Sequence, residues 1–192
     1  MEASVLEGGF GDAPVEAARA FRAAMRVMAR PGTIEALDAA RPPAPVSVAA
    51  GTLLLTLCDH ETGVYLAGAY DTAELREWLA FHTGAPVVAA GEAQFALGDW
   101  AALMPLSQYA VGSPEYPDRS ATLIVEMERL EAKGTGLRGP GIRERAELSL
   151  PDADAMRANA AQFPLGVDFF LTCGDRVAAL PRSTRLEDAP CT

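Results

Sequence analysis

The sequence is poor in the residues that most often hold metals or bond covalently to substrates. Among its 192 residues there are two histidines, three cysteines and a single lysine, Lys133. The cysteines lack CxxC spacing, which is typical of reduced intracellular thiols and not of a disulfide framework or an iron–sulfur site. A Schiff base requires a lysine, and Lys133 lies in a predicted glycine-flanked loop, a poor place for a desolvated amine. We therefore expect no cofactor and no metal site.

Long hydrophobic runs are absent too. No apolar stretch approaches the roughly 20 residues of a membrane-spanning helix, and the opening MEAS lacks the basic and then apolar pattern of a signal peptide. Acidic side chains outnumber basic ones by 26 to 16, and the resulting charge of −10 argues against a nucleic-acid-binding surface. We expect a cytoplasmic protein that binds neither membranes nor nucleic acid.

Apolar residues, by contrast, make up 49% of the chain, enough for a stable core. Helices are predicted over residues 13–30, 48–58, 72–83 and 152–163, with a short one after Asp99. Strands are predicted at 64–66, 86–89, 94–97, 121–130 and around Leu137, and 167–180 is predicted to be a hairpin that turns at Gly174-Asp175. This alternation predicts one domain over residues 1–192, an α/β layered fold with a mixed β-sheet flanked by helices.

The first predicted helix is amphipathic, with Asp12 as its cap and Pro31-Gly32 as its end. At 100° per residue, the apolar side chains on one side are Ala17, Phe21, Ala24, Met25 and Met28. Within about 80° of the surface on the other side lie four arginines, Arg19, Arg22, Arg26 and Arg30. Neighbouring guanidiniums repel one another unless they are screened, so this stripe is a candidate site for an anionic ligand or an acidic partner surface. The alternative is a solvated helix face.

A second group of residues suited to anions follows the last predicted strand. Arg182-Ser183-Thr184-Arg185 places two guanidiniums and two hydroxyls within four residues, and these groups can together bind a phosphate or phosphonate. The alternative is an exposed terminal segment without a ligand.

The string Gly134–Gly139 matches GxGxxG, the pattern of a dinucleotide-binding turn. That function requires a helix directly after the last glycine, to receive the pyrophosphate at its N-terminus. Here Pro140-Gly141 follows, and a loop between two antiparallel strands fits the residues better than a nucleotide-binding oxidoreductase.

Two further polar positions have both a structural and a catalytic interpretation. His82 lies in the last turn of its predicted helix, where a hydrogen-bonding role is preferred over acid/base catalysis. Asp59-His60-Glu61 forms a predicted turn, for which solvation is the simplest interpretation. The alternative function is a free-standing transferase or hydrolase that acts on a phosphorylated small molecule, with His82 as its acid/base.

Several segments taken together resemble one known family. They are, in chain order, FRAAMRVMARPG (residues 21–32), LLLTLCD (53–59) with Glu61-Thr62, FHTGAP (81–86), GPGI (139–142), FPLGVD (163–168) and LPRST (180–184). Their order and spacing resemble PhnH, a subunit of the carbon–phosphorus lyase core complex of bacterial phosphonate catabolism. The resemblance extends from about Phe10 to Arg185.

The resemblance implies a fold like that of pyridoxal-phosphate-dependent transferases, without the cofactor, and a homodimer that joins PhnG, PhnI and PhnJ. It also implies an accessory role in an assembly that displaces adenine from ATP by an alkylphosphonate, giving ribose 1-phosphonate 5-triphosphate before the C–P bond is cleaved. Catalysis is then expected in the other subunits. The positions it marks for anion binding or interface contacts are Arg30, Asp59, His82, Asp168 and Arg182, to which the helix pattern adds Arg26.

Overall fold

The computed structural model describes residues 7–187, in which five α-helices accompany nine strands. The helices are α1 (Ala13–Ala29), α2 (Val48–Leu57), α3 (Ala73–Thr83), α4 (Trp100–Leu103) and α5 (Ala153–Ala160). The strands are β1 (Glu35–Ala36), β2 (Val64–Leu66), β3 (Phe95–Asp99), β4 (Thr122–Glu126), β5 (Thr135–Arg138), β6 (Ala146–Leu148), β7 (Asp168–Cys173), β8 (Arg176–Leu180) and β9 (Arg185–Leu186).

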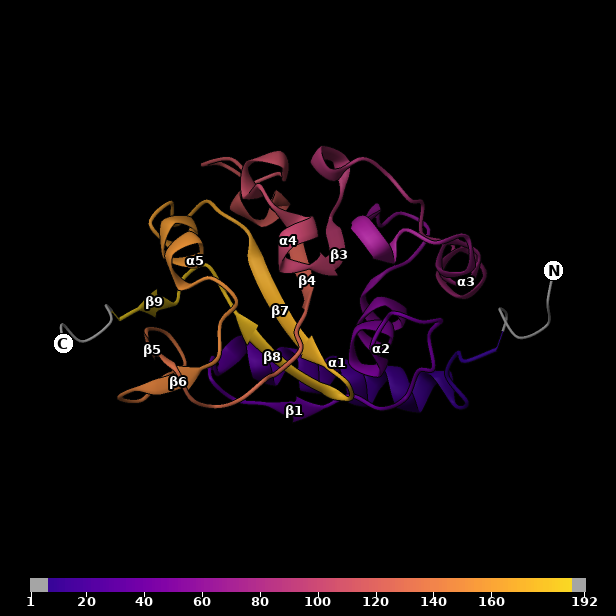
Figure 1. The fold of residues 1–192 in the computed structure, drawn as a ribbon, viewed down its shortest axis with the longest axis horizontal. Helices are drawn as coiled ribbons and strands as arrows, with labels where there is room; N and C mark the ends of the chain where they lie inside the picture. The colour runs from indigo at the N-terminus through magenta and orange to yellow at the C-terminus, as the bar shows by residue number, and fades with distance from the viewer. Residues whose placement is uncertain (1–6, 188–192) are drawn as a thin grey trace.

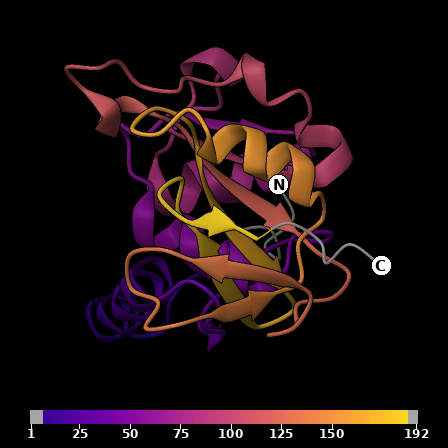
Figure 2. The ribbon, with the colours of Figure 1, turned by 90° about the vertical axis from the view of Figure 1, so that its left-hand side faces the viewer.

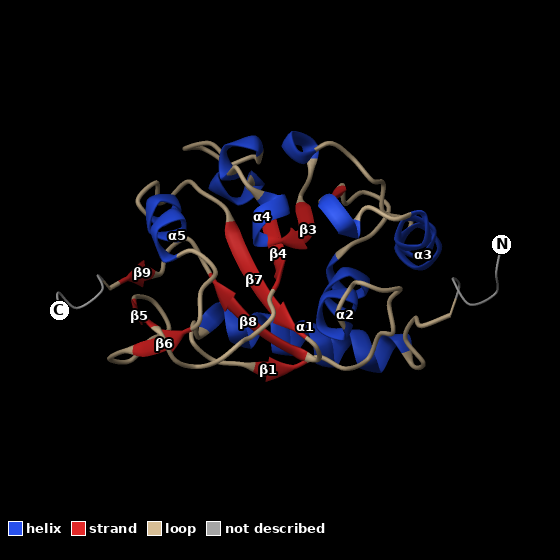
Figure 3. Cartoon of the chain, in the orientation of Figure 1, coloured by secondary structure: helices blue, strands red, loops and turns tan. Residues whose placement is uncertain are grey.

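A six-stranded mixed sheet with the order β1-β8-β7-β4-β3-β2 forms the centre of the molecule (Figures 1 and 3). Strands β2, β3, β4 and β7 are parallel, whereas β8 and β1 continue the sheet antiparallel. The β7–β8 hairpin turns at Gly174, whose φ of 61° is readily adopted by glycine. The mixed sheet and the predicted hairpin are thereby confirmed.

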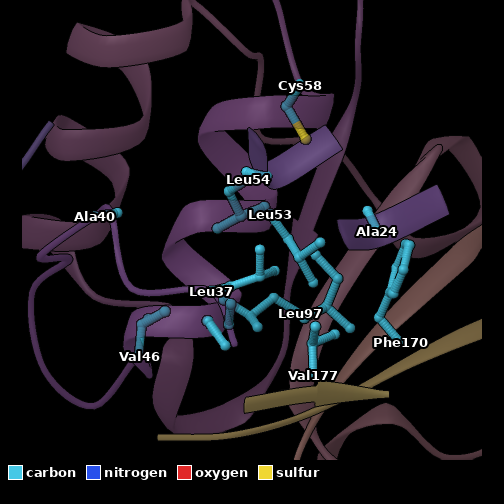
Figure 4. Packing of buried hydrophobic residues seen from close by; sticks show 14 of the residues in the cluster. Ala24, Leu37, Ala40, Val46, Leu53, Leu54, Cys58, Leu97, Phe170 and Val177 are labelled. Atoms are coloured by element: carbon cyan, nitrogen blue, oxygen red, sulfur yellow. The ribbon is translucent and has the colours of Figure 1, made fainter. Parts of the chain in front are cut away.

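The sheet is buried on both faces, as parallel strands require. One core packs α1, α2 and α3 against the sheet and contains side chains such as Leu53, Leu97 and Phe170 (Figure 4). The other lies beneath α4, α5 and the small sheet, with Leu103, Phe169 and neighbouring residues at its centre. Helices therefore cover both faces of the sheet. Within residues 7–187, none of the helices combines the length and apolar character needed to cross a membrane.

A second sheet, β6-β5-β9, lies at one end of the molecule beside α5 (Figure 2). The glycine string forms strand β5 itself, which continues through a turn into antiparallel β6 and not into a helix. The dinucleotide-binding interpretation is therefore wrong. The expected loop is wrong too, because residues 135–138 are themselves a strand that pairs antiparallel with β6 and β9. Gly139, at a φ of 133°, lies close to the backbone of Ser183, so the glycine loop contacts the segment that follows β8.

The bounds of α1 are as predicted, but two details of that helix differ. Its buried side consists of Ala20, Ala23, Ala24 and Val27, while Phe21 and Met25 are exposed. Small side chains let α1 pack closely against α2 and β8, so the partners, and not the largest apolar residues, decided which side is buried. Asp12 makes no side-chain cap; instead, the Glu16 carboxylate accepts the backbone N–H groups of Gly11 and Asp12.

The other predicted helices are present, although α5 ends at Ala160 and not at residue 163. The hydroxyls of Ser47 and Thr72 cap α2 and α3, and Asp99 and Asp152 cap α4 and α5. Two strand predictions are wrong in extent. Residues 86–89 contribute only a bridge from Val87 to Val64, and β4 ends at Glu126, four residues earlier than expected.

Candidate functional site

The most interconnected of the predicted site residues are Asp168 and Arg182. Asp168 begins β7 and Arg182 follows β8, so the antiparallel hairpin brings them together. The Arg182 guanidinium donates from Nε (3.2 Å) and Nη2 (2.6 Å) to the two oxygens of the Asp168 carboxylate, and its backbone N–H donates to the same group at 2.8 Å. Nη1 donates to the carbonyl of Pro117. Arg182 is thus occupied by internal bonds.

A cavity of about 610 Å³ lies beside this pair. Its wall is formed by the segment Arg182–Glu187, the turn after β5 and the C-terminal end of α5, three regions that lie side by side in Figure 2. The lining residues are Arg138, Gly139, Pro140, Ala160, Phe163, Arg182, Ser183, Thr184, Arg185, Leu186 and Glu187. The Arg-Ser-Thr-Arg segment and the glycine string, which were separate features of the sequence, meet at this cavity.

The arginines of α1 lie elsewhere. The Arg26 guanidinium forms a bidentate pair with Glu35 of β1, with both N···O distances at 2.8 Å. The hydrogen bond from Arg26 lowers the pKa of the Glu35 carboxyl. Arg30 is exposed at the end of the helix, where its backbone N–H donates to the carbonyl of Arg26. Arg26 therefore stabilises the contact between α1 and β1, while the Arg30 side chain extends from the surface.

Asp59 and His82 make local contacts. The Asp59 carboxylate accepts the Thr62 hydroxyl (2.8 Å) and the backbone N–H of Glu61 (2.9 Å), and these bonds lower the pKa of the Asp59 carboxyl. The imidazole of His82 packs against Trp78 and Phe81, with ring centroids 5.1 and 5.0 Å away. Asp59 thus has local hydrogen-bond partners. His82 does not, because its Nε2 is buried without a hydrogen-bond partner within residues 7–187, so the hydrogen-bonding role expected of His82 is not observed.

The six predicted residues do not form a single site. The helix that carries His82, α3, lies at the opposite end of the molecule from α5 and β9, and α1 runs along the α2 side of the sheet (Figure 1). Asp168 and Arg182 are in direct contact, whereas Arg26 and Arg30 share only the end of α1. Within residues 7–187, the side chains of Asp168 and Arg182 are the only two of the six that form hydrogen bonds with each other.

Comparisons with known proteins match nearly the full length of the chain, including all six predicted residues. The model of the family described as "Bacterial phosphonate metabolism protein (PhnH)" matches residues 8–187. The chain belongs to the PhnH family. It is 45% identical, over 97% of its own length and 98% of the relative, to the PhnH subunit of α-D-ribose 1-methylphosphonate 5-triphosphate synthase from Rhizobium meliloti (strain 1021). It is 30% identical, over 94% and 95% of the two chains, to HtxG of Stutzerimonas stutzeri, described as a candidate C-P lyase subunit.

One polar group of this PhnH-family chain was missed from the sequence. Glu126 ends β4, at the carboxyl edge of the parallel strands, where it accepts the backbone N–H of Ser47 (2.7 Å) and the Thr172 hydroxyl (3.1 Å). Burial raises the pKa of Glu126, and burial together with the nearby Glu126 and Asp99 carboxylates raises the pKa of Tyr70 to about 12. The sequence does place this acidic residue directly after an apolar run, at the end of a strand. The predicted strand is four residues too long, so Glu126 falls at an interior position of it.

Proposed function

We propose that this chain is an accessory subunit of the carbon–phosphorus lyase core complex. In this proposal it acts with sister subunits that displace adenine from ATP by an alkylphosphonate, giving ribose 1-phosphonate 5-triphosphate before the C–P bond is cleaved. The observation that carries the proposal is the 45% identity, across nearly the full length of both chains, to a subunit of α-D-ribose 1-methylphosphonate 5-triphosphate synthase.

In this proposal the chain contributes surfaces and binding groups, and its partners perform the chemistry. The support comes from how its polar residues are occupied. Arg182 is engaged with Asp168, Asp59 stabilises its own turn, and the His82 ring packs against Trp78 and Phe81, although its Nε2 has no hydrogen-bond partner within residues 7–187. Groups held in this way stabilise the fold, whereas an acid/base or nucleophile must reach a substrate atom. We therefore favour the accessory role over a free-standing transferase or hydrolase that uses His82.

We also propose that the single domain shares the architecture of pyridoxal-phosphate-dependent transferases without binding that cofactor. The mixed sheet with helices on both faces is compatible with this relationship. The Lys133 ammonium is exposed and pairs with the Glu131 carboxylate at 3.1 Å. An exposed, ion-paired amine lacks the desolvated pocket that activates a Schiff-base lysine, so Lys133 does not fit that role.

The partners that we propose are a second copy of this chain and the sister subunits PhnG, PhnI and PhnJ, in the cytoplasm. The outward side of α1 is our candidate contact surface for an acidic sister subunit. It combines exposed Phe21 and Met25 with the side chains of Arg22 and Arg30. Apolar area supplies association energy, and the guanidiniums favour an acidic partner over like-charged surfaces.

The central experiment is reconstitution. Tagged full-length chain is co-expressed with PhnG, PhnI and PhnJ, and the mass of the purified assembly is measured together with adenine release from ATP and methylphosphonate. We expect a stable complex, adenine release by that complex, and no turnover by this chain alone. Adenine release by the isolated chain, or an active complex that excludes it, would contradict the accessory role.

A second experiment tests the α1 surface. The double substitution Arg22→Ala with Arg30→Ala removes the two arginines of this surface and leaves the Arg26–Glu35 pair intact, and Arg176→Ala, at the exposed first residue of the otherwise buried β8, is a control for the loss of a surface arginine elsewhere. We expect the double variant to fold and to associate at least ~10-fold more weakly with the sister subunits, with no change for Arg176→Ala. An unchanged association constant in the double variant would remove this surface from the proposal.

A further inference from the structure

The wall of the cavity beside Arg182 carries more positive than negative charge. In the small sheet, Arg138 of β5 lies directly opposite Arg185 of β9. Opposed residues of an antiparallel pair extend to the same side of the sheet, so both guanidiniums share one face, and two like charges in this position repel each other. In a chain with a net charge of −10, such a pair requires a negatively charged group close by to screen it.

The acidic residues nearby neutralise only part of this charge. The Glu187 carboxylate accepts Nε of Arg138 on one oxygen and Nε of Arg145, at 2.7 Å, on the other. The Arg182 guanidinium is bound by Asp168 and the Pro117 carbonyl. Within residues 7–187, no carboxylate pairs with Arg185, whose side chain is exposed at the cavity. Arg185 is therefore the guanidinium that is available to a ligand.

A buried hydroxyl in the same wall also lacks a partner. Thr184 is 1% exposed, and its Oγ1 forms no hydrogen bond with any group of residues 7–187. A buried hydroxyl without a partner is costly, and native proteins satisfy nearly all such groups. Thr184 lines the cavity between Ser183 and Arg185. An oxygen-rich anion would accept hydrogen bonds from both hydroxyls and from the guanidinium.

Part of the cavity wall is apolar, and the cavity is larger than a bare anion requires. Phe163 is 61% exposed and lines the cavity together with Pro140, Ala160 and Leu186. A volume of about 610 Å³ is within the range of small-molecule sites, so a phosphate group alone would leave most of it empty. The accessible ring of Phe163 would pack well against a planar or apolar group.

We propose that this cavity binds a small organic molecule through a phosphoryl or phosphonyl group. The anionic group is held by Arg185, Ser183 and Thr184, and the organic part lies against Phe163. Arg182 is a positioning residue, because its bonds to Asp168 hold the 182–185 segment in place. This inference rests on the proposed function and names a ligand class for the chain that acts within it.

Binding is measured by calorimetry on the full-length chain without partners. The probes are ATP, adenosine, methylphosphonate and inorganic phosphate. We expect ATP to bind at least ~10-fold more tightly than adenosine, which lacks the charge, and more tightly than inorganic phosphate, which leaves the apolar wall uncovered. Methylphosphonate binding more tightly than ATP would assign the site to free phosphonates, and the opposite order would assign it to phosphate esters. No binding of either ATP or methylphosphonate would overturn the proposal.

Three variants locate the site. Arg185→Ala is expected to weaken binding of the tighter probe by ~10-fold or more, and Thr184→Val by several-fold. Thr184→Val keeps the side-chain shape and removes a hydroxyl without a partner, so its unfolding temperature should equal or exceed that of the original chain. Arg176→Ala is the matched control and should leave binding unchanged. Full-strength binding by Arg185→Ala would overturn the proposal.

The binding experiment and the reconstitution experiment can fail independently of each other. A chain that binds the probe but fails to join PhnG, PhnI and PhnJ would contradict the proposed function alone. A chain that assembles and supports adenine release, yet binds no probe in isolation or in the purified complex, would contradict the ligand site alone.

Discussion

The carboxylate of Asp168 binds both the side chain and the backbone of Arg182. Three N–H groups of Arg182 donate to it, at 2.6, 2.8 and 3.2 Å. The pair joins the first residue of β7 to the segment that leaves β8, at side-chain exposures of 21% and 13%. Charge-assisted bonds in such a sheltered place are among the stronger polar interactions of a fold. They also determine the position of the next three residues, which line the cavity.

Asp168→Asn should destabilise the chain. The amide keeps one acceptor oxygen but loses the negative charge that balances Arg182, so we expect a loss of about 2 kcal/mol in the free energy of unfolding. The measurement is urea denaturation at pH 7, followed by circular dichroism.

The matched control is Glu35→Gln, which breaks the exposed bidentate pair with Arg26. Surface ion pairs contribute little, so this variant should lie within about 1 kcal/mol of the original chain. Equal losses for the two variants would contradict a special role for the Asp168–Arg182 pair.

Glu126→Gln should change how stability depends on pH. Burial raises the pKa of Glu126, so the folded chain disfavours the carboxylate that the unfolded chain forms above about 4.5, its ordinary pKa. The contribution of Glu126 to the free energy of unfolding is fully present below that value, and it falls as the pH rises through the pKa of the folded chain. Glutamine can keep contacts with Ser47 and Thr172 without this penalty. The gain in stability of Glu126→Gln over the original chain should therefore be larger at pH 8 than at pH 4.

Urea midpoints at the two pH values measure this difference. Glu128→Gln, two residues further on and exposed, removes the same charge without the burial and should show little pH dependence relative to the original chain. A difference between Glu126→Gln and the original chain that stays constant from pH 4 to pH 8 would show that the Glu126 carboxyl titrates normally.

The thiols of Cys58 and Cys173 should differ in reactivity. Burial raises the pKa of Cys58 to about 12, whereas Cys173 is only half-buried. Since the thiolate is the nucleophile, we expect iodoacetamide at pH 8 to alkylate Cys173 at least ~10-fold faster than Cys58 in the folded chain. Peptide mass spectrometry gives the two rates separately. In concentrated urea the rates should converge, and a fast Cys58 in the folded chain would mean that the end of α2 opens readily.

Two substitutions to alanine test which side of α1 is buried. Val27→Ala removes a fully buried side chain and should cost about 2 kcal/mol of unfolding free energy, whereas Met25→Ala, on the exposed side, should stay within about 0.5 kcal/mol. Thermal or urea denaturation of both variants decides the matter. If Met25→Ala costs more than Val27→Ala, the sequence-based choice of the apolar side was right and the packing of α1 is different.

Local contacts depend on partners that are close in the chain. The caps at Ser47, Thr72 and Asp99 bond to backbone N–H groups three residues away, and Gly174 turns a hairpin between adjacent strands. Such contacts require no knowledge of distant segments. Most elements therefore have the predicted type. The exceptions are the strand predicted at 86–89, which is only a bridge, and the C-terminal end of β4, which comes earlier than predicted.

The candidate site depended on contacts that sequence spacing does not reveal. The sequence shows that the Arg-Ser-Thr-Arg segment is suited to binding anions, but it does not show the role of each residue in the segment. Asp168 lies 14 positions before Arg182 and occupies that guanidinium, and Arg138 lies opposite Arg185 although they are far apart in the chain. The contact with Asp168 assigns Arg182 to the fold, whereas no carboxylate of residues 7–187 pairs with Arg185, and the spacing of the sequence shows neither of these facts.

By itself, the amino-acid sequence determined the α/β class, the hairpin and membership of the PhnH family, since these follow from local periodicity and from ordered motifs. The tertiary structure alone decided which side of α1 is buried, which charges are neutralised, and that Thr184 and Arg185 line the same cavity. The physical reason is that burial and charge pairing depend on neighbours in space, and those neighbours come from distant parts of the chain.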